Sequence, residues 1–289
     1  MKYSCIVGII LGMTGFLGCA SKTVTISRSK LLMGHVPVNI SIKTSPENKE
    51  NVLLATDEAY KKAQEIETKL SSYNPDSEIS CLNQKAGKSY CSLSEETVKL
   101  LNFAQELRQK TEGAFDIRFA SPTPQGKNGM ILLLVNEGRL ANPATQIKID
   151  SLAKGYILDQ MIEVLQSKGF ENALVDAGGD IRASGGPWKV SIQIPDAAYG
   201  KNTKPFEIRN QALTTSANYE NSKNVVDPAN LKPVVRKESV SVIANSATLA
   251  NGLSTALYVL GPTKDALIKN NFPGIQIFWV NQKGEIKKE

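Results

Sequence analysis

The sequence predicts one compact domain of the α+β class, in which helices pack on a mixed sheet. Of its 289 residues, 41% are hydrophobic and 21% are charged, which is enough apolar material for one large core. Strand and helix periodicities both occur, but they do not alternate strictly as in a doubly wound parallel sheet. No internal repeat and no long linker divides the chain, so we expect a single unit.

The first eighteen residues are predicted to be a bacterial lipoprotein signal peptide. An apolar run follows Lys2 and ends in Phe16-Leu17-Gly18-Cys19, which resembles a lipobox. It is too short and too interrupted by glycine for a comfortable membrane span. We therefore expect removal of residues 1–18, a lipid on Cys19, a tether over 19–30 and a folded domain over 31–289.

Two other treatments of this segment remain open. It is either cleaved by the ordinary signal peptidase or retained as an N-terminal anchor. All three possibilities place the domain outside the cytoplasm, and the lipoprotein prediction places it on the periplasmic side of a bacterial membrane, held by its lipid.

The first predicted strand and two helices follow. Val36–Ile42 alternates apolar and polar residues, which predicts a strand. Apolar residues recur at helical spacing from Val52 to Leu70 and predict an amphipathic helix. A second helix begins near Ser92 or Ser94, either of which is a suitable N-cap, and ends at Gly113.

The middle of the chain is predicted to contain an exposed, irregular stretch before the third helix. Residues 121–143 are rich in Pro, Gly and Asn, which predicts an exposed excursion around a short strand at 131–135. A third helix is expected from Leu152 to Lys168. Four further strands are predicted after it, at Ala173–Asp176, Trp188–Ile194, Leu213–Ser216 and Ser239–Ala244.

The C-terminal part combines a helix with a hairpin. Ser246 is a good N-cap for a fourth helix, and Gly261-Pro262 ends it. The segments 274–280 and 285–288 are joined by a short polar turn and predict a closing hairpin.

Two cysteines remain in the folded part once Cys5 leaves with the signal and Cys19 takes lipid. Cys81 and Cys91 lie between two predicted helices and would meet an oxidising environment after export. They form either a disulfide or two free thiols. Without a nearby His or further Cys they are poor metal ligands.

Several kinds of site are excluded by residue type. The net charge of +6 is modest and dispersed, so no nucleic-acid partner is expected. There is no phosphate-binding P-loop, no Gly-x-Gly-x-x-Gly turn after a strand and no Cys-x-x-Cys pair. His35 is the single histidine, which leaves little basis for a Ser-His-Asp triad.

The remaining chemistry rests on carboxylates, hydroxyls and one lysine. Lys154 lies at a predicted helix N-terminus, where free N–H groups and the helix dipole favour an anion such as a diphosphate. By residue type alone, a solvated lysine is the alternative. Gly178-Gly179 follow a buried strand and suit a tight turn, flanked by Asp176 and Asp180, which have the reach to meet a ligand.

Five short segments occur in a fixed order, at 71–80, 113–117, 152–156, 175–182 and 248–262. Together they resemble the ApbE family of flavin transferases (FAD:protein FMN transferases), from about Met33 to the C-terminus. The resemblance implies an ApbE-like, T-fold-like domain that transfers FMN from FAD to a threonine, with Mg²⁺ bound and AMP released. The implied acceptor is an exported flavoprotein subunit of a respiratory complex such as the sodium-pumping NADH:quinone reductase.

The resemblance also assigns roles to individual residues. The positions implied to contact FAD are Met33, Tyr73, Ala114, Phe115, Asp116, Lys148, Lys154 and Val226. The positions implied to hold Mg²⁺ are Ser151, Asn251 and Thr255. Catalytic roles fall to Asn251, Thr255 and Lys154.

Four positions depart from the family pattern. His35 stands where the family usually has threonine, and the other three concern the metal and catalytic groups. Asn251 replaces an aspartate, Asn224 replaces a histidine that is a candidate general base, and Lys148 replaces an aspartate. An amide oxygen can coordinate Mg²⁺ but brings no negative charge, so we expect weaker metal binding. Two alternative functions follow: a catalytically impaired FAD-binding carrier or sensor lipoprotein, and a Mg²⁺-dependent FAD hydrolase.

Overall fold

An eight-stranded antiparallel sheet is the centre of the fold in the computed structural model, which describes residues 23–195, 202–217 and 225–288. The chain order of its strands is not their order across the sheet. The strands, in spatial order, are β1 (Val24–Leu32), β2 (Val36–Thr44), β6 (Ala173–Ala177), β7 (Asp180–Ala183), β10 (Ala212–Ser216), β11 (Ser239–Ala244), β12 (Gln276–Val280) and β13 (Ile286–Lys288).

Three long helices and the main apolar core cover one face of this sheet. They are α1 (Lys49–Leu70), α5 (Asp150–Ser167) and α6 (Ala247–Leu260). A smaller core lies on the opposite face, beneath a hairpin of β8 (Trp188–Val190) and β9 (Phe206–Ile208). Because both faces are covered, β11 is buried along its whole length.

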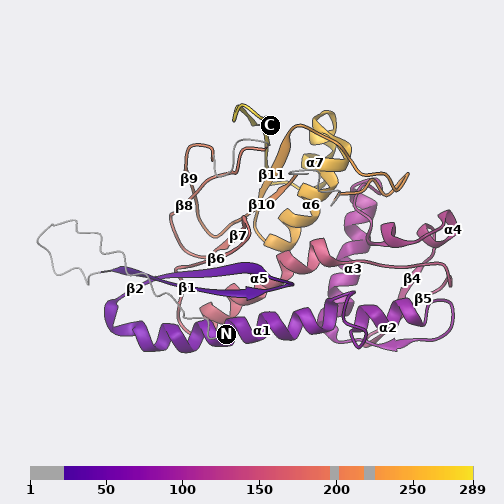
Figure 1. Cartoon of the computed structure of the whole chain (residues 1–289), viewed down its shortest axis with the longest axis horizontal. Coiled ribbons are helices and arrows are strands. Elements are labelled where there is room, and N and C mark those ends of the chain that lie inside the picture. Colours follow the sequence, from indigo (N-terminus) through magenta and orange to yellow (C-terminus); the bar gives the residue numbers. More distant parts are fainter. Residues whose placement is uncertain (1–22, 196–201, 218–224, 289) are drawn as a thin grey trace, which may run out of the picture.

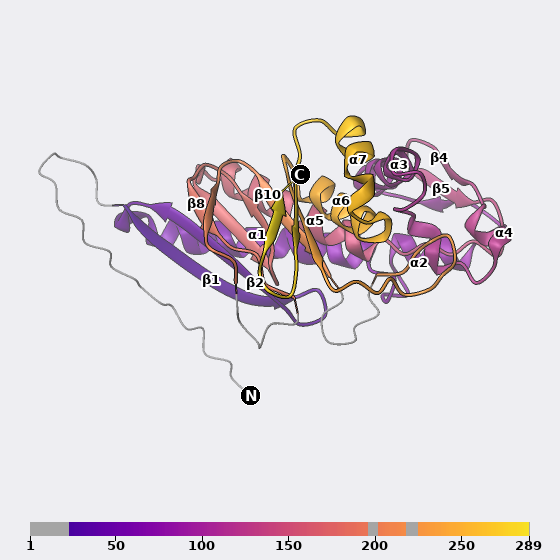
Figure 2. The same ribbon diagram turned by 90° about the horizontal axis from the view of Figure 1, so that it is seen from above.

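A second cluster of short elements lies at the end of the molecule away from the β1–β2 hairpin (Figures 1 and 2). It contains a three-stranded sheet and two helices, whose members are α2 (Glu78–Gln84), β3 (Cys91–Ser92), α4 (Pro124–Lys127), β4 (Ile131–Leu133) and β5 (Glu137–Leu140). Beside it runs α3 (Glu95–Lys110), and α7 (Asp265–Asn271) follows α6. Short 3₁₀ turns lie at η1 (Pro46–Asn48), η2 (Ile117–Ala120) and η3 (Pro262–Lys264).

Several predictions from the sequence are confirmed. The α+β class holds, as do the helices within one to three residues of their expected starts. The expected mixed sheet is instead antiparallel at every described strand pair. Ser94 and Ser246 both cap their helices through the side-chain oxygen, which accepts from the backbone N–H three residues on. The C-terminal hairpin is β12–β13. A disulfide joins Cys81 to Cys91, which resolves the alternative left open by the sequence.

Other predictions are wrong. The tether was expected to extend to residue 30, but residues 24–30 belong to β1, which pairs with β2 from Val24↔Thr44 onward. The sequence pattern did not predict β1 because many of its residues are polar. Polar residues are expected there, since β1 is an edge strand with much of its surface exposed. The excursion at 121–143 is partly buried, since Ile131 and Leu140 belong to the core.

No helix within the described ranges is both long and apolar enough to cross a bilayer.

Candidate active site

Two adjoining cavities are surrounded by the residues that the sequence singled out. The first, of about 280 Å³, is lined by Ala114, Phe115, Asp116, Lys148, Ser151, Lys154, Val226, Asn251 and Thr255, among others. The second, of about 530 Å³, is lined by Met33 and Tyr73 and by apolar parts of α1 and α5. Asp150 and Lys154 belong to both linings. The N-terminus of α5 therefore forms the wall between the cavities.

The start of α5 combines free backbone donors with a lysine. Its N-cap residue, Ile149, provides no side-chain hydrogen bond, so the first N–H groups of the helix lack a capping side chain. Ser151 lies in this first turn, Lys154 follows directly after it, and both line the first cavity. An anionic group is the natural partner for such a helix end.

Asp180 is the buried carboxylate of the first cavity, with 3% of its surface exposed. It begins β7, directly after the Gly178-Gly179 turn. Lys154 Nζ lies 2.5 Å from its Oδ2, and Asn251 Nδ2 donates to the same oxygen over 2.8 Å. The backbone N–H of Thr215 donates to Oδ1 over 3.1 Å. Asp180 thus joins β7, β10, α5 and α6 at one point.

Asn251 and Thr255 lie one turn apart on α6, as their spacing predicted. Thr255 Oγ1 donates to the backbone carbonyl of Asn251 over 3.0 Å and keeps its lone pairs for another partner. Asn251 is 5% exposed, and its amide nitrogen is directed to Asp180. Within the described part of the chain, Oδ1 of Asn251 accepts no hydrogen bond. Ser151 lines the same cavity.

Lys148 lies at the rim of the first cavity. Its Nζ donates to Tyr73 Oη over 2.7 Å and lies 3.1 Å from a carboxylate oxygen of Asp150. Burial lowers the pKa of Lys148, but the hydrogen bonds to Tyr73 and Asp150 outweigh burial and raise the pKa above its ordinary value. Lys148 is therefore a cation at neutral pH. Tyr73 is 78% exposed at the mouth of the second cavity.

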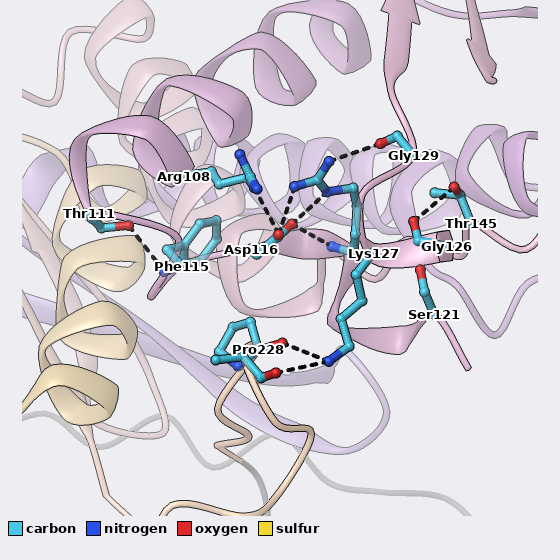
Figure 3. A network of polar contacts seen from close by, with 12 residues as sticks. Arg108, Thr111, Phe115, Asp116, Ser121, Gly126, Lys127, Gly129, Thr145 and Pro228 are labelled. Atoms are coloured by element: carbon cyan, nitrogen blue, oxygen red, sulfur yellow. Dashed lines mark hydrogen bonds and ion pairs between the residues drawn. The ribbon is translucent and has the colours of Figure 1, made fainter. Parts of the chain in front are cut away.

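Asp116 positions the loop that closes one side of the first cavity (Figure 3). Its carboxylate accepts from Arg108 Nε over 2.9 Å and from Arg118 Nε and Nη2 over 2.9 and 2.8 Å. It also caps η2 through the backbone N–H of Arg118. Since two guanidinium groups occupy this carboxylate, we assign Asp116 a positioning role for Ala114 and Phe115.

Val226 is held against the first cavity by contacts of its loop. An isolated bridge pairs it with Pro233. Lys127 of α4 donates to the carbonyl oxygens of Pro228 and Ala229 over 3.0 and 3.3 Å, which ties the loop to the second cluster of elements (Figure 3).

Asp176 lies near the site but lines neither cavity. Burial raises the pKa of Asp176, and so does the nearby charge of Asp180. The backbone N–H of Gly179 donates to the carboxylate over 2.8 Å and lowers the pKa, but by less, so the pKa remains above its ordinary value. Its role is to hold the Gly178-Gly179 turn.

The structure thus brings together every predicted FAD and metal position; their roles in binding remain predictions. By sequence, Asp180 was only one of two carboxylates beside a glycine turn, and no local pattern indicated its contact with Asn251. The described residues contain no cluster of three or more His, Cys, Asp or Glu side chains arranged to hold a metal ion. Cys19 and Asn224 lie outside the described residues.

Comparison with known proteins gives consistent matches. The model of the ApbE family matches residues 33–124 and 126–279. An FAD:protein FMN transferase of Vibrio cholerae is 27% identical over 254 residues, which cover 74% of this chain and 76% of the relative. One of Haemophilus influenzae is 29% identical over 253 residues, covering 72% of this chain and 73% of the relative.

Solved structures agree on the fold. The flavin transferase ApbE from Vibrio cholerae has a TM-score of 0.76 at 22% identity and covers 93% of this chain and 97% of its own. The ApbE protein from Thermotoga maritima has a TM-score of 0.77 at 22% identity and covers 92% of this chain and 97% of its own. At this identity the likeness concerns the architecture.

Proposed function

The chain belongs to the ApbE family, and we propose that it is an FAD:protein FMN transferase, an enzyme that moves FMN from FAD onto a threonine of a flavoprotein acceptor. One observation carries the proposal: the two cavities share Lys154 and the uncapped start of α5. An elongated dinucleotide with a central diphosphate suits that arrangement, because its charged middle meets the cation and the helix N-terminus.

The residues present support a defined reaction. The acceptor threonine hydroxyl attacks the FMN phosphorus and loses its proton, a P–O bond forms there, and the bond from that phosphorus to the AMP oxygen breaks, so that AMP leaves and the proton passes to the solvent. Lys154 holds the diphosphate, and Lys148 at the rim adds a second positive charge. Phosphoryl transfer depends mainly on such positioning and charge stabilisation.

The donor set of the first cavity fits a magnesium ion. Mg²⁺ prefers oxygen ligands. Asn251 offers an amide oxygen and Thr255 a hydroxyl oxygen from α6, and Ser151 of α5 stands at the position of the backbone carbonyl ligand. These residues would hold the ion, which would offset negative charge on the diphosphate. Because none of the three is charged, we expect the affinity to be modest.

The finer part of the proposal concerns location and partner. We expect lipid on Cys19 to hold the protein at the periplasmic side of a bacterial membrane. The acceptor would then be an exported subunit of a respiratory complex. Support comes from the sequence of residues 1–19 and from the names of the relatives, which specify a protein acceptor.

The direct test mixes the mature protein with FAD, Mg²⁺ and an acceptor that bears the target threonine. Fluorescent flavin bound covalently to the acceptor, with an equal amount of AMP, supports the proposal. Lys154→Met should abolish labelling. Lys168→Ala removes a lysine from the other end of α5 and should leave it intact. AMP without labelled acceptor would replace the proposal with FAD hydrolysis, and retention of intact FAD would replace it with a flavin carrier.

A further inference from the structure

The first cavity lacks a charged metal ligand at the three predicted positions, yet it contains a buried carboxylate beside one of them. We propose that Asp180 is the anionic ligand of the divalent cation in this protein, and that Lys154 competes with the cation for it until FAD binds. The inference rests on the proposed function, because it concerns the cation of that same site.

The other carboxylates of the cavity are less suitable. Asp116 is bound by Arg108 and Arg118, whose charges are permanent. Asp150 lies at the exposed rim, where 39% of its side chain is accessible, and pairs with Lys148. Hard divalent cations require negative charge from their ligands for strong binding.

Asp180 has the required position. It is next to Asn251, since Asn251 Nδ2 donates to its Oδ2 over 2.8 Å. Asn251 is itself buried and lines the cavity. Its side-chain oxygen, Oδ1, accepts no hydrogen bond among the described residues. A cation that replaces Lys154 at Asp180 would therefore meet Asn251 in the same small space.

Lys154 is the group that must leave. Its amine is the cationic partner of Asp180 within the described residues, and 34% of its side chain is accessible. Its flexible stem ends in a compact charge that can exchange one anion for another. An FAD diphosphate at the start of α5 would draw the amine away, and the freed, buried carboxylate would then need another positive charge.

This exchange makes FAD and the cation cooperative ligands. Each ligand favours the state in which Lys154 has left Asp180, so each should tighten the binding of the other by the same factor. Without Lys154, the cation would meet no competitor, and FAD would change the affinity for the cation only through the charge of its diphosphate, by a smaller factor.

The test measures Mn²⁺ binding to the full mature protein by electron paramagnetic resonance, with and without FAD and without acceptor. FAD should tighten Mn²⁺ binding to the wild type by about 5-fold or more. Asp180→Asn should weaken it by about tenfold or more in both conditions. Lys154→Met should bind Mn²⁺ more tightly than the wild type when FAD is absent, and adding FAD should tighten Mn²⁺ binding by a smaller factor than in the wild type.

The matched control is Asp176→Asn, which removes a carboxylate from the same hairpin but outside both cavities. Equal weakening by Asp176→Asn and Asp180→Asn would overturn the proposal, because it would indicate a general effect of charge. An Asp180→Asn variant that binds Mn²⁺ as tightly as the wild type would also overturn the proposal. If circular dichroism shows that Asp180→Asn does not fold, Lys154→Met decides, and an unchanged Mn²⁺ affinity refutes the competition.

Labelling of the acceptor, measured separately, distinguishes the two proposals. The expected Mn²⁺ pattern without any labelling would reject the transferase and leave the role of Asp180 standing. Full labelling of the acceptor by Asp180→Asn, with unaltered Mn²⁺ affinity, would reject the role of Asp180 and leave the transferase standing.

Discussion

Gly155 allows α5 and α6 to approach closely enough to build the site. A Cβ atom at this position would lie 2.4 Å from the carbonyl oxygen of Ala247 and 2.8 Å from the backbone nitrogen of Thr248. Both atoms belong to the first turn of α6, so neither can rotate away. Gly155→Ala must therefore push α6 from α5, which separates Lys154 from Asn251.

The expected loss of stability follows from two opposing terms. Alanine gains about 1 kcal/mol over glycine in a helix interior, and overpacking costs about 1–3 kcal/mol. Contact with rigid backbone puts this site at the upper end, so the net loss is about 2 kcal/mol. For a domain of this size, that corresponds to a fall in Tm of about 4–8 °C.

The assay is thermal unfolding followed by circular dichroism, with Gly252→Ala as the matched control. At Gly252 the added Cβ meets Leu107 Cδ1 at 2.5 Å, the end of a side chain that can change rotamer. We expect Gly252→Ala to lose less than about 1 kcal/mol. A Gly155→Ala variant that melts at or above the wild type, or together with Gly252→Ala, would show that the two helices are not held at backbone contact.

Three further predictions concern charge and covalent constraint. Asn251→Asp should lower the Mg²⁺ concentration for half-maximal transfer, because it places a second carboxylate beside Asp180; an unchanged or higher requirement would contradict this. Burial raises the pKa of Glu96, but hydrogen bonds from Lys62 and Lys69 outweigh it and leave the pKa below its ordinary value. Its stabilising effect is therefore complete above the ordinary carboxyl pKa and is lost as pH falls through the lowered one. Glu96→Gln should cost about 0.5–1 kcal/mol at pH 7 in urea unfolding, and the difference from the wild type should shrink in acid. Replacing both Cys81 and Cys91 with serine should lower the free energy of unfolding by about 2–3 kcal/mol, as expected for a short closed loop; a variant as stable as the wild type would argue against the bridge.

Local signals in the sequence predicted the elements whose stability is local. Ser94 and Ser246 were recognisable as N-caps because a capping oxygen acts on its own helix within three residues. In contrast, β1, β3 and β5 are stabilised by pairing with other segments, and their own residues give weak strand patterns. The short helix α2 was not predicted, although Ser77 caps it, because its seven residues are too few to show a helical repeat of apolar positions.

The same distinction applies to the site. Helical spacing predicted that Asn251 and Thr255 share a face of α6, and the start of α5 predicted an anion-binding position for Lys154. The meeting of Asp180 with Asn251 joins residues 71 apart in the sequence. It depends on how β7 is placed against α6 by the sheet, which no local pattern encodes.

The pairing of charges in the first cavity suggests why a cation would be required at all. Lys148 is paired with Asp150 and Lys154 with Asp180, so each cation has its own carboxylate before any ligand enters. If an FAD diphosphate takes both lysines, two carboxylates lose their partners. Asp150 is at the rim and can be hydrated, whereas Asp180 is 3% exposed and has no such compensation. The need for a divalent ion would then arise from the buried carboxylate that the diphosphate leaves behind, and not from the diphosphate alone.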